Sequence, residues 1–467
     1  MRRRAARLTV ALVVLALLVA ATGTTLAYPA RERPTLRAGH VSRPADGPTV
    51  ISVQGFHVDG QGNRKKPARL VGVTPEGNRS WVVNGAHDGF RWFYDVDALS
   101  NGDLLVASTR PGSTLVYELD PETHERVWVQ RLPIEDTHDV DMLPNGNLVV
   151  ANMRNYDPKR GVSDDRVFVY DRHNDTVVWQ WTVRNHFPND TDGGFKPDWT
   201  HVNDVDAVDG GFIISLRNFD QVVKVNRSTK RIVWRLGRDG HHDTLFEQHN
   251  PDYLRGPNGT PTLLVADSEN DRVVEYARRN GTWVRTWTLR GPLSWPRDAD
   301  RLPNGDTLVT DTLHHRVIEV TPTGRVVWEF YAPWGPYDAE RVTPDYRPVA
   351  TGPTMAELNR TGTYRVHGGD PTAIVARTTP AELVRSLADG TPVGGPVSAA
   401  ATRWSHVAPW IRPVWLPPWA FLYLLLAGLV LLGWAGAEAW LARGRLVARL
   451  RRVRGVTEDR GPSHGDD

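Results

Sequence analysis

The chain has 467 residues and a formal net charge of only +2, so its bulk electrostatics indicate no nucleic-acid partner. It contains no cysteine, which excludes disulfides, thiolate metal sites and a cysteine nucleophile. Its 41 glycines, 34 prolines and 18 tryptophans, together with the lack of long helical patterns between about residue 50 and residue 330, favour an all-β chain with many turns.

The first element in chain order is an apolar run from Leu8 to about Ala27. It follows four arginines: Arg2, Arg3, Arg4 and Arg7. The run is about 20 residues long, which is enough to cross a bilayer, and no A-x-A cleavage site comes directly after it. A retained helix and a cleaved signal peptide both fit. We assign residues 1–30 to an N-terminal membrane anchor or signal segment and expect an anchor.

The middle of the chain repeats one pattern of strand, Asn-Gly-type turn and strand. Two further strands follow each copy, and the last usually carries Trp. The four clearest copies are YDVDALSNGDLLVAS from Tyr94, HDVDMLPNGNLVVAN from His138, NDVDAVDGGFIIS from Asn203 and RDADRLPNGDTLVTD from Arg297; a looser copy begins at His249, and a degenerate one runs from about Thr49 to Trp81.

Four strands per unit and a period of about 40 to 50 residues are typical of a β-propeller. We therefore predict an all-β, six-bladed β-propeller over residues 49–331, with the recurring Trp packed between blades. Five or seven blades are the alternatives, because the first copy is weak.

A second apolar run follows the repeats. Residues 332–413 are rich in Pro, Gly and Thr, contain a helix candidate at PAELVRSLADG, and are predicted to form a cap or stalk. Residues 414–441 are predicted to form a transmembrane helix, with tryptophans toward its ends as in an aromatic belt. Residues 442–467 form a basic and then disordered tail. These tryptophans are Trp415, Trp419, Trp434 and Trp440.

Both arginine clusters are expected on the cytoplasmic side of the membrane by the positive-inside rule. The propeller would then lie outside the cell, attached to the lipid bilayer. Seven N-x-S/T sequons agree with an extracellular location, although such short motifs arise often by chance. They are Asn78, Asn174, Asn189, Asn226, Asn258, Asn280 and Asn359.

Polar residues begin the first strand of most repeats, and in a propeller this strand lines the central channel. The aligned column contains Tyr94, His138, Asn203, His249 and Arg297. His201 lies two residues before Asn203, so strand alternation places both on one side, and Arg217 ends the next strand. His can act as nucleophile or base, Asn as a neutral donor and Arg as a fixed cation. We predict that His138, His201, Asn203, Arg217 and His249 converge on one anionic substrate.

Other interpretations of these residues remain open. A His at a strand start can be a structural hydrogen-bonding residue, and three imidazoles can bind a metal. No H-E-x-x-H motif supports a metal, so we expect no metal and no cofactor. The repeated aspartates Asp139, Asp141, Asp204, Asp206, Asp298 and Asp300 are expected to be structural and to tie turns, and the pairs His241–His242 and His314–His315 to lie at the surface or in loops.

The segments DWTHVNDVDAV…SLRN, FEQHN and THDVDMLPNGNLVVAN resemble the arylsulfotransferase family of six-bladed propellers, over roughly residues 50–335. The resemblance implies that His249 accepts the sulfuryl group covalently, that His201, Asn203 and Arg217 bind its oxygens, and that His138 is the upstream active-site histidine. The family's cysteine pair is absent and the N-terminal portion is short, which puts a dimerising N-terminal domain in doubt. The family's further threonine has two candidates, Thr310 and Thr312.

The resemblance implies a membrane-anchored arylsulfotransferase. It would move a sulfuryl group from a small aryl sulfate donor to a phenolic acceptor through a sulfohistidine, with ping-pong kinetics. The alternative is a non-catalytic propeller that binds a protein or glycan partner, because VADSENDRVVEY and VTDTLHHRVIEV also resemble NHL-type repeats. A quinone-dependent dehydrogenase propeller is ranked last, since it normally needs a metal and more blades.

Overall fold

The computed structural model describes residues 2–27, 35–56, 65–85, 89–370 and 379–458. The chain forms two compact units. The propeller unit comprises residues 34–377 and 402–410, and the terminal unit comprises residues 1–33, 378–401 and 411–467. Each unit is described by itself below.

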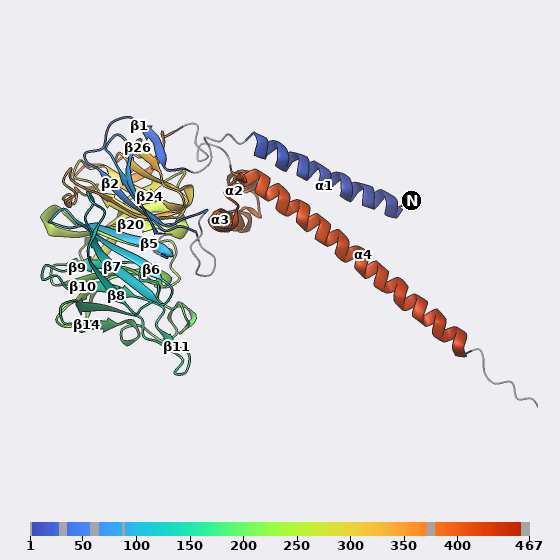
Figure 1. Ribbon diagram of the computed structural model, residues 1–467, viewed down its shortest axis with the longest axis horizontal. Coiled ribbons are helices and arrows are strands. Elements are labelled where there is room, and N and C mark those ends of the chain that lie inside the picture. The colour runs from blue at the N-terminus through green and yellow to red at the C-terminus, as the bar shows by residue number, and fades with distance from the viewer. Residues whose placement is uncertain (1, 28–34, 57–64, 86–88, 371–378, 459–467) are drawn as a thin grey trace, which may run out of the picture. The chain divides into compact units, whose positions relative to one another are not determined.

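Within the described residues, six mostly antiparallel sheets of four or five strands form the propeller unit (Figure 1). This confirms the predicted six-bladed propeller. From the inner strand outward, the second blade contains β5 (Trp92–Ala98), β6 (Leu104–Arg110), β7 (Ser113–Leu119) and β8 (Arg126–Leu132), and the third contains β9 (Val140–Met142), β10 (Leu148–Asn152), β13 (Arg166–Asp171) and β14 (Thr176–Thr182). The fourth blade contains β15 (Val202–Val208), β16 (Gly211–Leu216), β17 (Gln221–Asn226) and β18 (Ile232–Gly237), and the fifth contains β19 (His249–Gly256), β20 (Thr260–Asp267), β21 (Arg272–Arg279) and β22 (Thr282–Arg290). The sixth blade contains β23 (Pro296–Arg301), β24 (Thr307–Asp311), β25 (Arg316–Val320) and β26 (Val326–Tyr331).

The first blade joins the two ends of the repeat region. Its outer strands are β2 (Thr49–Val53), β3 (Arg69–Val73) and β4 (Arg79–Asn84), and its innermost strand is β27 (Pro336–Arg341). Ile51 of β2 pairs with Ala339 of β27. The first copy therefore supplies three strands rather than the four expected from the sequence. Pairing early and late strands in one sheet closes the ring of blades.

Smaller elements complete the propeller unit. Strand β1 (Arg37–Val41) extends the sixth blade, and β28 (Gly362–Arg365) adds a parallel strand to the fifth. A two-stranded ribbon, β11 (Tyr156–Asp157) and β12 (Val162–Ser163), projects from the third blade. Short 3-10 turns are η3 (Val183–Asn185), η4 (Thr191–Gly193), η5 (Arg217–Phe219), η6 (Pro257–Gly259), η7 (Ser268–Asn270) and η8 (Thr312–His314).

Tryptophans of the outer strands pack between neighbouring blades, as predicted. Trp181 of β14 lies in one buried cluster with residues of the fourth blade such as Phe212. Its indole N–H donates to the carbonyl of Lys230 at 3.1 Å, which satisfies the polar atom of a large apolar ring. Trp287 and Trp328 make the same kind of bond to the blades that follow them.

Asp139, Asp141 and Asp298 have a structural role, as expected, but they connect inner strands rather than tie turns. Asp141 accepts a hydrogen bond from the backbone N–H of Ala207 at 2.8 Å, and Asp298 accepts one from Ala339 at 3.2 Å. Asp139 accepts one from Val205. These N–H groups lie at the inner edge of a blade, and a carboxylate from the preceding blade satisfies them. Burial raises the pKa of Asp139 to about 7 and that of Asp141 to about 6.

The paired histidines lie at the surface or in a turn, and one of them is buried. His241 and His242 are exposed, as predicted, but His315 is buried. It ends the η8 turn with a left-handed φ of 61°, and its ring packs 4.9 Å from that of Trp334. The turn directs His315 inward, which strand alternation did not anticipate.

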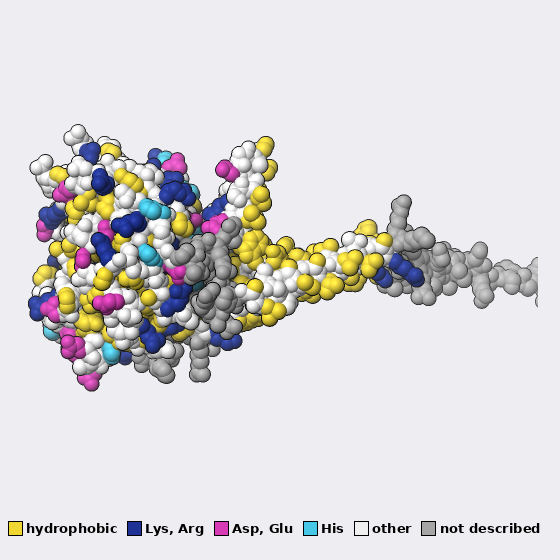
Figure 2. Space-filling view, turned by 90° about the horizontal axis from the view of Figure 1, so that it is seen from above, with side chains coloured by type: hydrophobic (Ala, Val, Ile, Leu, Met, Phe, Trp, Pro, Cys, Tyr) yellow, Lys and Arg dark blue, Asp and Glu magenta, His cyan; other side chains and the backbone are white. Residues whose placement is uncertain are grey.

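The terminal unit is helical. It contains α1 (Arg2–Leu26), α2 (Pro380–Ala388), the first part of α3 (Gly394–Ile411) and α4 (Pro418–Glu458). Helix α2 coincides with the predicted helix candidate, and its capping box joins Thr379 and Glu382. Residues Arg4–Leu26 and Pro418–Gly444 are long and apolar enough to cross a membrane. In Figure 2 the side chains along the long helices are mostly hydrophobic, whereas charged side chains are scattered over the propeller.

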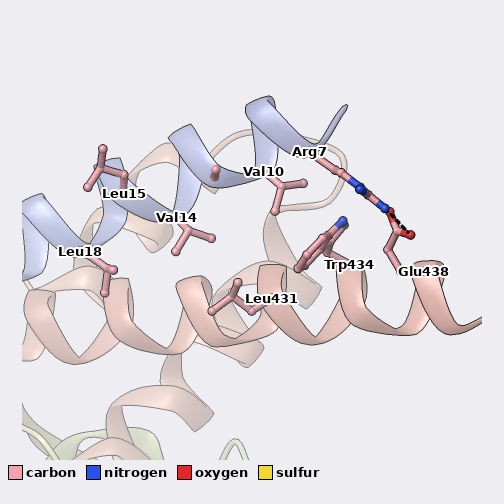
Figure 3. Close-up of a pocket in the computed structure, with 9 residues that line it drawn as sticks. Arg7, Val10, Val14, Leu15, Leu18, Leu431, Trp434 and Glu438 are labelled. Atoms are coloured by element: carbon pink, nitrogen blue, oxygen red, sulfur yellow. Dashed lines mark hydrogen bonds and ion pairs between the residues drawn. The ribbon is translucent and has the colours of Figure 1, made fainter. Parts of the chain in front are cut away.

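Helices α1 and α4 lie side by side and antiparallel (Figures 1 and 3). Arg7 pairs with Glu438 at 3.0 Å near the start of α1 and toward the end of the apolar part of α4. Apolar side chains of both helices, among them Val14 and Leu431, line a groove of about 720 Å³ beside this pair (Figure 3). The pairing fixes which ends of the two helices lie together.

Candidate active site

Three consecutive blades bring three histidines to one place. His138 precedes β9, His201 precedes β15 and His249 begins β19, and all three are buried. The ring centroids of His138 and His201 lie 4.9 Å apart. The ring of Tyr337, from β27, lies 5.3 Å from His138 and 5.9 Å from His249. The predicted histidines therefore share one cluster around Tyr337.

Four blades share a backbone feature. In each, the residue two positions before the member of the aligned column has a left-handed backbone conformation. These residues are Asp136, His201, Glu247 and Trp295, with φ values of 56°, 43°, 46° and 52°. Such values are unusual for residues other than Gly and store backbone strain, which is common at functional sites. Strand alternation was therefore the wrong reason for placing His201 beside Asn203, because β15 begins only at Val202.

His201 is held between a carboxylate and a guanidinium. Its Nδ1 lies 2.9 Å from the Asp198 carboxylate, and Nη1 of Arg217 lies 2.8 Å from its Nε2. A guanidinium can only donate, so Nε2 accepts and Nδ1 carries the proton. Burial and the charge of Arg217 lower the pKa of His201 to about 4. The neutral imidazole thus orients Arg217, which also donates to Glu247 at 2.5 and 3.0 Å.

His249 is in the same tautomer as His201, with its lone pair on Nε2. Its Nδ1 lies 3.2 Å from the carbonyl oxygen of Glu247 and 2.8 Å from the hydroxyl of Ser268. A carbonyl only accepts, so Nδ1 carries the proton and Nε2 has a lone pair. Burial, with Arg297 and Arg217 next in importance, lowers the pKa of His249 well below its usual value. A neutral imidazole in this tautomer is a competent nucleophile.

His138 belongs to a second polar network. Its Nδ1 is buried without a hydrogen-bond partner among the described residues, and its Nε2 lies 4.0 Å from Asp136. Asp136 accepts a bond from the hydroxyl of Tyr94 at 2.7 Å and pairs with Arg154 at 2.7 Å. Burial, followed by the charge of His201, lowers the pKa of His138 well below its usual value, which leaves a neutral base.

Asn203 lies beside the backbone that leads to His249. Its amide Nδ2 donates to the carbonyl of Gln248 at 2.9 Å, and its Oδ1 is buried without a partner among the described residues. One Nδ2 hydrogen therefore remains for a ligand.

Arg297 and Tyr337 are site residues to which the sequence analysis gave no role. Arg297 was in the aligned column, and its buried guanidinium lies 4.5 Å from the ring centroid of Trp295 and 4.7 Å from that of Tyr337. Its Nη1 donates to Gln54, and among the described residues no carboxylate pairs with it. Burial lowers the pKa of Arg297 to about 10. Tyr337 had a short sequence signal, since the residues YD at Tyr337 repeat the start of the copy at Tyr94.

The two threonine candidates have different surroundings. Thr310 donates to Asp298 at 3.3 Å, and Thr312 is buried in η8. In the part of the chain that the structure describes, no group of three or more His, Asp or Glu side chains could hold a metal ion.

An open cleft lies beside the histidine cluster. It has a volume of about 670 Å³, and its lining includes Arg217, Asp198, Glu247 and Lys196. The guanidinium of Arg217 therefore reaches both the buried cluster and the cleft.

The chain has some similarity to several solved structures. A protein of unknown function from Bacteroides caccae has 14% identity and a TM-score of 0.44, covering 63% of this chain and 98% of its own. An auxiliary nutrient binding protein from Bacteroides thetaiotaomicron has 10% identity and a TM-score of 0.39, covering 56% and 74%. A virginiamycin B lyase from Staphylococcus aureus has 8% identity and a TM-score of 0.36, covering 64% and 88%.

No curated protein matches the chain. Residues 75–254, which include His138, His201, Asn203, Arg217 and His249, match the arylsulfotransferase (ASST) family model.

Proposed function

We propose that the protein is a membrane-anchored arylsulfotransferase that moves a sulfuryl group from an aryl sulfate to a phenolic acceptor through a sulfohistidine at His249. The observation that carries the proposal is the state of His249. Its Nδ1–H is engaged by the Glu247 carbonyl and Ser268, and its neutral Nε2 lies in a cluster with two guanidiniums. The family match supports the same reaction class.

In the first half-reaction, Nε2 of His249 attacks the sulfur of the donor. An N–S bond forms, the S–O bond to the aryl group breaks, and the phenolate leaves. Charge in such a transfer spreads over the peripheral oxygens, as it does for a phosphoryl group. Fixed donors aimed at those oxygens lower the barrier most. Arg217 and the free amide hydrogen of Asn203 are suited to this task, and the His201 contact holds Arg217 in place.

In the second half-reaction, the hydroxyl oxygen of the acceptor attacks the sulfur and the N–S bond breaks. The phenolic proton needs a base within hydrogen-bond reach. We assign this role to His138, because its Nδ1 lacks a partner among the described residues and burial keeps the ring neutral. His201 is less suited, since both of its nitrogens are engaged.

We propose that α1 and α4 both span the membrane, with the propeller outside the cell. The Arg7–Glu438 pair supports this topology, because it sets the start of α1 beside the basic end of α4. Both arginine clusters then face the cytoplasm, as the positive-inside rule requires.

If the propeller were a non-catalytic binding scaffold, its histidine side chains would not be expected to contact one another. A binding scaffold has no use for histidines in contact, yet the rings of His138 and His201 lie 4.9 Å apart. This distance supports the transferase over the scaffold.

The test is a trapping experiment on the full-length protein in detergent. We expect a ³⁵S-labelled aryl sulfate, added without acceptor, to label the protein on His249, and a phenol to remove the label as an aryl sulfate. The His249→Ala variant should remain unlabelled, and the exposed control His241→Ala should label normally. Labelling of the His249→Ala variant, or no label on the unaltered protein, would refute the proposed mechanism.

A further inference from the structure

A short segment near the C-terminus packs against the propeller within the same unit. Residues 402–410, at the end of α3, belong to the propeller unit although the rest of α3 does not. Nδ1 of His406 lies 3.1 Å from Glu269, and Nε2 lies 2.9 Å from Asp271. Two carboxylates both require donors, so both nitrogens carry protons and His406 is a cation.

The charge on His406 has a clear physical origin. Burial lowers its pKa, but the bonds to Asp271 and Glu269 outweigh burial and raise it to about 9. For the carboxyl of Glu269, burial raises the pKa, but His406, Arg217 and Arg403 lower it by more. The pKa of Glu269 therefore lies below its usual value. The ring of Trp295 stacks 6.1 Å from the imidazole and completes its surroundings.

A second anchor lies four residues further along the segment. The ammonium group of Lys66 donates to the backbone carbonyls of Pro409 at 3.1 Å and of Trp410 at 2.9 Å. These carbonyls lie in the last turn of α3, where helical partners are lacking. Lys66 thereby fixes the position of Trp410.

The indole of Trp410 lies next to the candidate active site. It stacks on Phe56 with centroids 4.0 Å apart, and it meets Trp295 edge-on at 6.1 Å. Trp295 in turn contacts the ring of His249 at 6.2 Å. The guanidinium of Arg297 lies 6.0 Å from the Trp410 ring and has no carboxylate partner among the described residues.

We propose that residues 402–410 are part of the active site, where Trp410 supplies one face of the subsite for the substrate's aromatic ring and His406 positions that face. The inference rests on the proposed function and extends it. Aromatic faces hold aryl rings by offset or edge contacts. Arg297 carries the charge that an aryl sulfate needs as a partner, and a buried cation without a counter-charge favours binding an anion.

A binding measurement tests Trp410 without requiring catalysis. Full-length His249→Ala protein in detergent is titrated with 2-naphthyl sulfate by calorimetry, alone and with Trp410→Ala or Trp410→Leu. We expect each second substitution to weaken binding at least about tenfold. Trp410→Leu keeps the apolar volume, so it remains informative if Trp410→Ala does not fold. The matched control is Trp128→Ala, on the outer strand β8, which should bind like the parent.

The outcomes separate this inference from the proposed function. Binding by the Trp410 variants within twofold of the parent overturns the inference, even if the unaltered protein transfers sulfuryl groups. Weakened binding with no transferase activity in the unaltered protein supports the aromatic subsite and rejects the transferase.

The role of His406 is tested by a pH profile. In the unaltered protein, we expect the KM for the aryl sulfate to rise as pH passes about 9, because His406 then loses its charge. In His406→Gln, the KM should be raised at all pH values and should lack that rise, while kcat changes less. An identical pH dependence of KM in the two proteins overturns the positioning role.

Discussion

The inner strands of the propeller carry two kinds of buried ionisable group side by side. His138 and Asp139 are neighbours in sequence, and burial favours the neutral form of both. The carboxylate of Asp139 accepts a backbone N–H from the next blade, whereas Nδ1 of His138 has no partner among the described residues. A buried polar group with a partner is suited to holding the fold together, and one without a partner is suited to chemistry. The following predictions are tests of that contrast.

The largest effect is expected for the nucleophile. His249→Ala should lower kcat for aryl-sulfate turnover by at least about 1,000-fold, since removing a covalent nucleophile abolishes the two-step route. Initial rates with an aryl sulfate and a phenol measure this, with His241→Ala as the matched control. A rate within tenfold of the unaltered protein would remove His249 from the mechanism.

Arg217 should have the next largest effect. Arg217→Ala should lower kcat by about 100- to 1,000-fold, because it removes a fixed donor for the sulfuryl oxygens. His201→Ala should reproduce part of the loss through the lost contact with Arg217. Single-turnover rates separate this chemical effect from substrate binding, and an effect confined to KM would contradict the assignment.

Substitution of Asp298 should change the stability of the fold and not the rate of the chemical step. Asp298→Ala leaves the buried N–H of Ala339 without its acceptor and should lower the free energy of unfolding by about 1–3 kcal/mol. Asp298→Asn retains an acceptor oxygen and should lose much less. Urea unfolding measures both, and a loss of the same size in the two variants would mean that the hydrogen bond is unimportant.

The smallest effect is expected in the pH dependence of stability. Asp139 has a folded-state pKa raised to about 7, so its contribution is full below its unfolded pKa and is lost as pH rises through 7. His201 has a folded-state pKa lowered to about 4, so its contribution is present above its unfolded pKa and is lost as pH falls through 4. The two trends oppose each other, so each partly masks the other in the unaltered protein.

Substitution can expose one of these opposing trends. Asp139→Asn removes the titrating carboxyl, so its stability should fall less, or rise more, than that of the unaltered protein between pH 5 and pH 8. Urea midpoints at several pH values measure the difference. Parallel profiles would show that Asp139 does not titrate in this range.

The sequence by itself determined the repeat, and with it the propeller and the Trp-filled seams between blades. Periodicity and turn residues are local signals, and four-stranded units can only bury their faces by stacking into a ring. The column of Tyr94, His138, Asn203, His249 and Arg297 also followed from the repeat alone. Even the overlooked Tyr337 carried a short signal of the repeat, in the residues YD.

Only the tertiary structure decided which polar atoms are engaged and which remain available. The closing of the ring by β27 and the docking of Trp410 on Phe56 both join residues that lie far apart in the chain. Such long-range contacts leave no periodic pattern in the chain. The tautomers of His201 and His249 also depend on tertiary contacts, because a proton's position on an imidazole is set by the partner at its other nitrogen.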